Sequence, residues 1–162
     1  MSTTPTEQKP PIERVKPPLL LMRVANPIIK ALAPRAKGVQ AFAIVLHFQG
    51  RRSGKTYDVP AGYRQVNGEI YIATNSGWRH NFAGGRDVEV TFLGRRQPAR
   101  ATLIADHEVV ARYYVGRYAE MGPKGAARGL GVRINFNRAP THEEWVDFVR
   151  RSGMSLVRID LG

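Results

Sequence analysis

Between residues 41 and 105, short apolar runs alternate with turn signals, and this pattern constrains the fold more than any other feature. Residues 57–63 place Tyr, Val, Ala and Tyr at every second position, which is typical of a strand with one buried face. Asn67-Gly68 is the dipeptide of a type I′ hairpin turn. The remaining strands are expected at 41–48, 69–74, 88–92, 97–105, 132–136 and 154–161.

Six or seven short strands, mostly linked by hairpins, predict a mainly β (α+β) fold in which a small antiparallel barrel carries peripheral helices. Pro60 cannot donate to a strand ladder and therefore favours an edge position. Helices are expected at 106–120 and after Thr141, which forms a capping box with Glu144. Ser76 is expected to cap a short helix through Trp78, and the Gly-rich stretch 121–131 is expected to be a loop.

The composition divides the chain into three regions. Residues 1–18 are rich in Thr, Pro, Lys and Glu and predict a disordered tail. Residues 19–37 predict a helical arm whose apolar residues are flanked by cations. The arm either packs on the core of the domain, which is the favoured interpretation, or contacts an anionic membrane surface. Residues 38–162 are expected to form one domain, which fits a chain of this length.

The chain carries a formal net charge of +12, which favours anionic partners. Nucleic acid is one such partner, but there is no helix-turn-helix, zinc or RNP-type signature to support it. The absence of cysteine excludes disulfides and thiol nucleophiles. No signal peptide and no apolar run of about twenty residues is evident, so the expected location is the cytoplasm, with the arm as the one contact to the inner face of the membrane.

The stretch from Gly50 to Lys55 places three cations, two glycines and a serine between two predicted strands. Arginine offers a rigid fork of donors and lysine a compact charge, and both suit phosphate or carboxylate. The glycines allow the backbone to approach a ligand closely. The spacing differs from that of a P-loop. The stretch therefore predicts an anion site, with a solvated hairpin loop as the alternative.

No side-chain constellation for protein-borne chemistry is found. The four histidines lie on separate predicted elements, and no metal site is expected. His47 lies in an apolar strand and is interpreted as a satisfied core or barrel-facing histidine, whereas His80, close to Trp78, is the better candidate for a place near a ligand. There is no Gly-Xaa-Ser-Xaa-Gly nucleophile motif. An enzyme with this sequence would therefore use a cofactor for its chemistry.

Several motifs occur in an order that resembles the deazaflavin (F420)-dependent nitroreductase family, within the flavin/deazaflavin oxidoreductase superfamily. They are the basic loop at 50–55, Val59-Pro60, Asn67-Gly68, residues 73–77, Trp78-Xaa-Xaa-Asn81 and residues 88–90. The resemblance covers residues 40–105 and implies a split β-barrel. It also implies an oxidoreductase that uses reduced coenzyme F420 to transfer a hydride to a quinone, enone or nitro-type acceptor.

The resemblance also implies roles for individual residues. Those expected to bind the phosphate, the ring and the tail of the cofactor are Arg51, Arg52, Ser53, Gly54, Lys55, Val59, Pro60, Ala61, Asn75, Ser76, Gly77, Trp78 and Asn81. A lysine that contacts the cofactor in many members of the family has no counterpart here, so this contact is either missing or supplied by another residue, for which Arg79 is the candidate. The candidate catalytic tyrosines, for which core packing is the alternative, are Tyr113, Tyr114 and Tyr118.

Other functions stay open at this point. A barrel of this kind could bind FMN or haem, or hold a flavin without turnover, because a fold does not fix a function. Nucleic-acid binding is the third class. The sequence leaves open the physiological substrate, the proton donor and the oligomeric state, a homodimer included.

Overall fold

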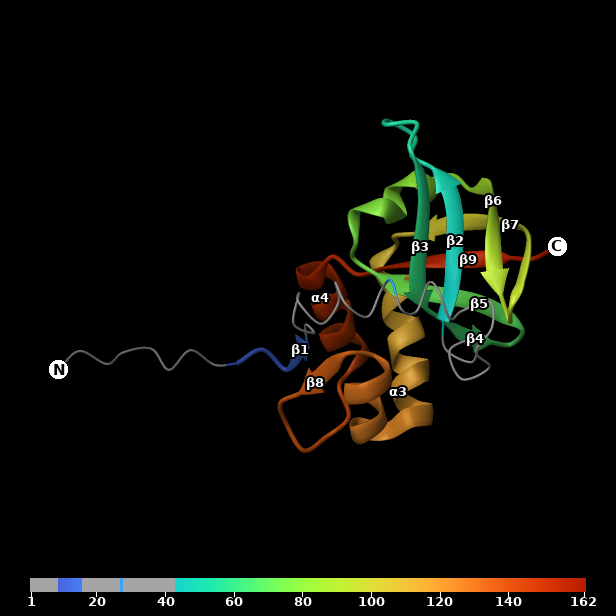
Figure 1. The fold of residues 1–162 in the computed structure, drawn as a ribbon. Coiled ribbons are helices and arrows are strands. Elements are labelled where there is room, and N and C mark those ends of the chain that lie inside the picture. Colours follow the sequence, from blue (N-terminus) through green and yellow to red (C-terminus); the bar gives the residue numbers. More distant parts are fainter. Residues whose placement is uncertain (1–8, 16–26, 28–42) are drawn as a thin grey trace. The chain divides into compact units, whose positions relative to one another are not determined.

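The computed structural model describes residues 9–15, 27 and 43–162, and the chain divides into two compact units (Figure 1). Among the described residues, the barrel unit comprises 27, 43–106 and 153–162, and the helical unit comprises 9–15 and 107–152. This division differs from the single domain expected over 38–162. The predicted arm at 19–37 lies outside the described residues except for Pro27, so its membrane contact stays a prediction.

The barrel unit is a seven-stranded sheet with the order β3-β2-β6-β7-β9-β5-β4. Every neighbouring pair in this sheet is antiparallel. The strands are β2 (Ala43–Gln49), β3 (Thr56–Gly62), β4 (Arg64–Val66), β5 (Glu69–Thr74), β6 (Arg86–Phe92), β7 (Arg95–Ile104) and β9 (Ser155–Asp160). The C-terminal strand β9 lies between β5 and β7 and so joins the two hairpin systems.

One stretch of chain supplies both edges of the sheet and brings them toward each other. Strands β3 and β4 are the two edge strands, and only Tyr63 separates them in the sequence. Strand β3 also contacts β5, across the sheet order. These contacts curl the sheet into an open barrel, which confirms the predicted fold of mostly antiparallel strands (Figure 1). Pro60 lies in edge strand β3, as its missing N–H requires.

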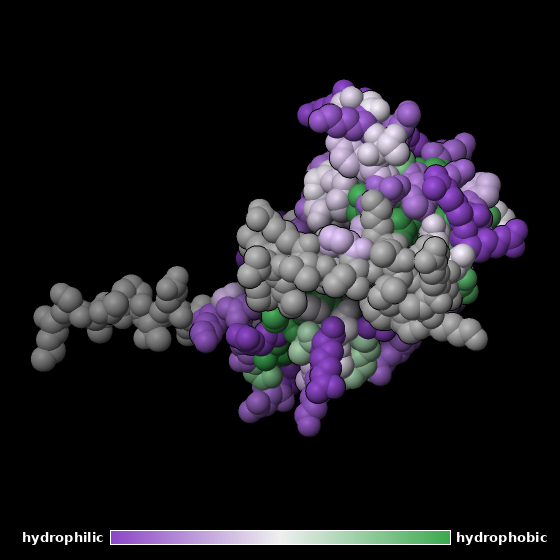
Figure 2. All heavy atoms as spheres, in the orientation of Figure 1, coloured by the Kyte–Doolittle hydropathy of each residue, from purple (hydrophilic) through white to green (hydrophobic). Residues whose placement is uncertain are grey.

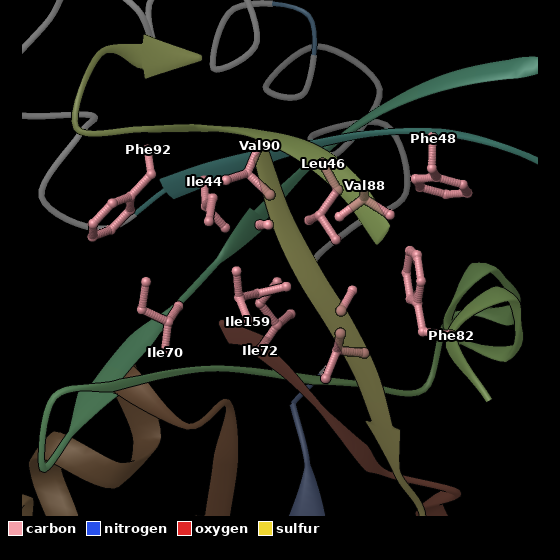
Figure 3. Close-up of a cluster of buried hydrophobic side chains, with 13 residues drawn as sticks. Ile44, Leu46, Phe48, Ile70, Ile72, Phe82, Val88, Val90, Phe92 and Ile159 are labelled. Atoms are coloured by element: carbon pink, nitrogen blue, oxygen red, sulfur yellow. The ribbon is translucent and has the colours of Figure 1, made fainter. Parts of the chain in front are cut away.

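Alternate residues of the strands fill the barrel with apolar side chains (Figure 3). Ile44, Leu46 and Phe48 of β2 face Ile70 and Ile72 of β5 across this core. Burial of a side chain of this size contributes about 1.5–3 kcal/mol. At one end of the core, Phe48 meets Phe82 with ring centroids 5.0 Å apart and an interplanar angle of 74°. This edge-to-face pair forms the floor beneath the segments that make the candidate site.

Two hairpin turns of the barrel unit contain residues with left-handed backbone conformation, and the sequence predicted the first of them. Asn67 and Gly68 have φ angles of 51° and 82°, as a type I′ turn requires, so this prediction is confirmed. Leu93 and Gly94 repeat the pattern between β6 and β7, with φ angles of 49° and 79°.

The helical unit contains α3 (His107–Gly129), α4 (His142–Ser152) and a two-stranded sheet of β1 (Ile12–Arg14) and β8 (Val132–Ile134). The capping box of α4 is confirmed, because Thr141 N–H donates to Glu144 Oε2 at 2.8 Å and Glu144 N–H donates to Thr141 Oγ1 at 3.2 Å. Trp145 and Phe148 of α4 are buried.

Two expectations for the helical unit are wrong. The predicted disordered tail contains β1, whose Ile12 is 0% exposed and whose backbone is held by β8. The predicted loop at 121–131 is largely helical. Gly122 interrupts α3 with a φ angle of 68°, and Pro123 then starts a new turn, a position that suits its fixed φ.

Candidate functional site

A hollow of about 830 Å³ opens in the barrel unit between the β2–β3 loop and η1 (Gly77–Phe82), a 3-10 helix. Its lining joins the basic loop to the Trp78–Asn81 segment, two motifs that the sequence predicted to share a site. The lining residues are Phe48, Gly50, Arg51, Arg52, Ser53, Tyr57, Gly77, Trp78, His80 and Asn81. The hollow therefore combines the cations of the basic loop with the aromatic side chains of Phe48, Tyr57 and Trp78.

The basic loop is a tight turn that projects beyond the ends of β2 and β3 (Figure 1). Gly50 N–H donates to Lys55 O at 2.8 Å, and Gly54 N–H donates to Gly50 O at 2.9 Å. The arginines and the lysine of the loop are exposed, and Figure 2 shows hydrophilic side chains at its tip. Arg51, Arg52 and Lys55 form no ion pair with a carboxylate of any described residue.

Asn81 fastens the basic loop to η1. Its Oδ1 accepts a hydrogen bond from Arg51 N–H at 2.9 Å, and its Nδ2 donates to Trp78 O at 2.8 Å. Arg51 Nη1 donates to His80 O at 3.3 Å and makes a second link. Both ends of the Asn81 amide are thus engaged within the protein. In this structure Asn81 sets the position of the loop relative to Trp78.

Arg79 fastens the other side of η1. Its Nη1 donates to Asn75 O at 2.7 Å and to Ser76 O at 2.9 Å, and its Nε donates to Ser155 Oγ at 3.3 Å. Arg79 does not line the hollow, and its role as a substitute for the lysine contact stays a prediction. Ser76 precedes η1 as predicted, but its side chain makes no capping hydrogen bond.

Sequence analysis missed Tyr57, which is part of the lining. Its ring stacks on Phe48, directly opposite on β2, with centroids 5.7 Å apart and an interplanar angle of 28°. Its hydroxyl lies 3.2 Å from Ser53 Oγ. A Cβ on Gly50 would lie 2.8 Å from the Tyr57 ring, so this close approach requires glycine. The signal was available, because Tyr57 begins the alternating run directly after the basic loop.

The structure brings some of the implied cofactor-binding residues together and leaves others apart from the hollow. Arg51, Arg52, Ser53, Gly77, Trp78 and Asn81 line it. The remaining ones lie in the same unit outside that lining, and their roles stay predictions: Gly54, Lys55, Val59, Pro60, Ala61, Asn75 and Ser76.

The three candidate catalytic tyrosines lie on α3, in the helical unit. Tyr114 is 0% exposed and stacks on Trp145 at 5.4 Å with an interplanar angle of 15°. Burial raises the pKa of its phenol. Tyr113 meets the Tyr114 ring edge-on at 5.6 Å, and Tyr118 is tilted against Trp145 at 6.0 Å. Aromatic packing thus accounts for these rings, and a catalytic role for any of them stays a prediction.

Both ring nitrogens of His47 have hydrogen-bond partners, as predicted, but the expected place of His47 in the core or facing the barrel interior is wrong. Nδ1 lies 2.6 Å from Asp58 Oδ1, and Nε2 lies 2.8 Å from Thr91 Oγ1. The alternation of β2 places His47 on the face opposite to Leu46 and Phe48, outside the barrel core. The histidine therefore ties three neighbouring strands together.

Within residues 9–15, 27 and 43–162, no group of three His, Asp or Glu side chains is arranged to hold a metal ion. None of the helices in the same ranges is long and apolar enough to cross a membrane.

Comparisons with known proteins give likenesses to solved structures only. No family model matches the chain, and no curated protein matches it. Among solved structures, it is similar to an FAD- and haem-binding protein from Mycobacterium smegmatis, with 18% sequence identity and a TM-score of 0.42. The match covers 84% of this chain and 66% of that chain, just under two thirds of its length. The proposal for the ligand of the hollow therefore rests on the residues that line it.

Proposed function

We propose that the hollow binds coenzyme F420, a deazaflavin that carries a phosphate, and that the chain is a reductase. One observation carries this proposal: a loop with three cations lies fastened against the aromatic residue Trp78 by the Asn81 amide. A ligand with an anionic group and a flat ring would use the cations and the aromatic side chains of the hollow at once.

The residues present fit such a cofactor. The volume of about 830 Å³ lies within the range of ligand pockets, roughly 300–1,000 Å³. Arg51, Arg52 and Ser53 would hold the phosphate with charge-assisted hydrogen bonds of about 1.5–3 kcal/mol each, nearer the lower value because the loop is exposed. Because Gly50 has no side chain, the Tyr57 ring and the Ser53 hydroxyl can occupy the space in which a Cβ would lie. Trp78 would form a wall beside the ring.

A bound reduced deazaflavin would supply a hydride from its C5 to a quinone, enone or nitro-type acceptor. The work of the chain would be to hold the two reactants within about 3–3.5 Å and to exclude water from the space between them. No protein nucleophile is needed for such a transfer. The proton would come from solvent or from a tyrosine.

FMN is the second candidate ligand, because it also joins a phosphate to a planar tricyclic ring and so suits both the cations and the aromatic side chains of the hollow. Haem, with its carboxylates and flat macrocycle, meets the same description less closely. Binding of these ligands without hydride transfer would make the chain a cofactor-binding protein and not a reductase.

A fluorescence titration with F420, FMN and haem at matched salt tests the proposal. We expect F420 to bind most tightly, and Arg51→Ala to weaken it at least tenfold through the loss of a charge-assisted contact. Arg64→Ala is the matched control, since Arg64 is also exposed and lies on β4, outside the lining. Failure of all three ligands to bind would refute the proposal. Equal losses in the two variants would show a general charge effect.

A further inference from the structure

The ring of Tyr57 is held in one position beside the basic loop. It stacks on Phe48 with centroids 5.7 Å apart, and its hydroxyl lies 3.2 Å from Ser53 Oγ. Gly50 packs against the ring so closely that an added Cβ would lie 2.8 Å from it. Tyr57 is nevertheless 40% exposed and lines the hollow. A side chain that is both fixed and accessible is suited to contact a ligand.

The hydroxyls of Tyr57 and Ser53 carry two protons in total, and the hydrogen bond between them uses only one. Each hydroxyl can donate one hydrogen bond. The bond between them uses one proton, and Ser53 Oγ meets the backbone N–H of Lys55, 3.3 Å away, only as an acceptor. Whichever hydroxyl donates within the pair, the other has a proton left for a third partner. If Ser53 donates to the phenol, the Tyr57 O–H is the free donor.

The charge around this free donor indicates what it binds. Arg51 and Arg52 line the same hollow, and neither forms an ion pair with a carboxylate of a described residue. Two guanidinium groups beside a hydroxyl donor favour an anionic acceptor, and phosphate offers several oxygens in the required fork geometry.

We propose that the Tyr57 hydroxyl is a ligand of the cofactor phosphate and makes the hollow select the phosphate-bearing deazaflavin over the same ring without phosphate. This inference rests on the proposed function, because it assumes that the anionic group at the basic loop belongs to that cofactor. Tyr57 acts together with Ser53, whose hydroxyl orients the phenol. The selectivity arises because a phosphate oxygen would replace water as the acceptor of the exposed phenol and make a charge-assisted hydrogen bond, which a ligand without phosphate cannot offer.

Tyr57→Phe tests the inference, because it removes one oxygen and keeps the ring stacked on Phe48. We expect F420 to bind about tenfold more weakly, which corresponds to the loss of one hydrogen bond to a charged group. Affinity for the phosphate-free deazaflavin should stay unchanged within twofold. Tyr71→Phe is the matched control, since the Tyr71 hydroxyl donates to Glu69 and lies outside the lining. Both affinities should stay at wild-type values in this control.

The outcomes separate the inference from the proposed function. If wild-type protein binds F420 but Tyr57→Phe leaves its affinity unchanged, the inference is wrong and the proposed function survives. Equal weakening of both ligands would also overturn the inference, since it would mean that the phenol acts on the ring site. If wild-type protein binds neither ligand, the proposed function fails and the inference fails with it. Circular dichroism and thermal unfolding establish that each variant is folded.

Discussion

Replacement of Asn81 by alanine removes the side chain that links the basic loop to η1. The variant loses the hydrogen bonds from Arg51 N–H and to Trp78 O, of which the first is exposed and the second partly buried. A neutral hydrogen bond contributes about 0.5–1.5 kcal/mol net. We therefore expect the free energy of unfolding to fall by about 1–2 kcal/mol, measured by urea denaturation.

The effect on ligand binding should be larger than this loss of stability suggests. A loop released from η1 must be ordered again when the ligand binds, and fixing one backbone residue costs about 1–2 kcal/mol. Each 1.4 kcal/mol is a factor of ten in affinity, so F420 should bind about tenfold more weakly to Asn81→Ala. A fluorescence titration at constant salt measures this loss.

Asn135→Ala is the control for Asn81→Ala. The Asn135 Nδ2 donates to Pro10 O at 2.7 Å in the helical unit, so the variant also loses a side-chain amide bond to the backbone. We expect it to lose comparable stability and to keep wild-type affinity for F420. Wild-type affinity in Asn81→Ala would refute the reasoning, because it would show that the loop binds its ligand without being fastened to Trp78.

Two further predictions concern the helical unit. The pKa of Glu144 is lowered to about 2, first by its hydrogen bonds with Arg138 and then by the backbone N–H of Thr141. A lowered folded-state pKa contributes stability above the unfolded-state value of 4.5, and that contribution is lost as the pH falls toward 2. Urea denaturation should therefore show less loss of stability over this range in Glu144→Gln than in the wild type, and parallel curves would contradict the assignment. The Tyr114 hydroxyl is buried without a hydrogen-bond partner among the described residues, so Tyr114→Phe should leave the melting temperature equal or raised. A large loss of reductase activity in this variant, with stability unchanged, would instead support the catalytic role that the resemblance implies.

Features that depend on local backbone geometry could be predicted from the sequence. The Asn67-Gly68 turn requires two consecutive positive φ angles, which few residue pairs tolerate. The Thr141–Glu144 capping box depends on residues three apart. The alternation of apolar residues fixed which face of each strand is buried, and from this the barrel could be expected.

Features that depend on partners distant in the sequence could not be predicted in this way. Strand β1 is three residues long, lies in a polar segment and has β8 as its partner strand. The Arg79 guanidinium is engaged by Asn75, Ser76 and Ser155 in the folded chain, which its place beside Trp78 does not reveal.

The same limit applies to the candidate site. The basic loop was recognised as an anion site because its cations are adjacent in the sequence. The alternating pattern places Tyr57 on a strand directly after the basic loop, which indicates proximity to the loop, but its stacking on Phe48 and its contact with Ser53 depend on the fold. The resemblance implies that Asn81 contacts the cofactor, which stays a prediction, but the sequence does not indicate that its amide also links the basic loop to η1.

The central claim is that the barrel unit holds a deazaflavin for hydride transfer. The most direct test mixes reduced F420 with menadione and follows oxidation of the cofactor by absorbance, with and without the protein. The proposal predicts that the protein accelerates this oxidation, and that Arg51→Ala reduces the acceleration while Arg64→Ala does not. Equal rates with and without the protein, at concentrations that saturate binding, would contradict the assignment of the chain as a reductase.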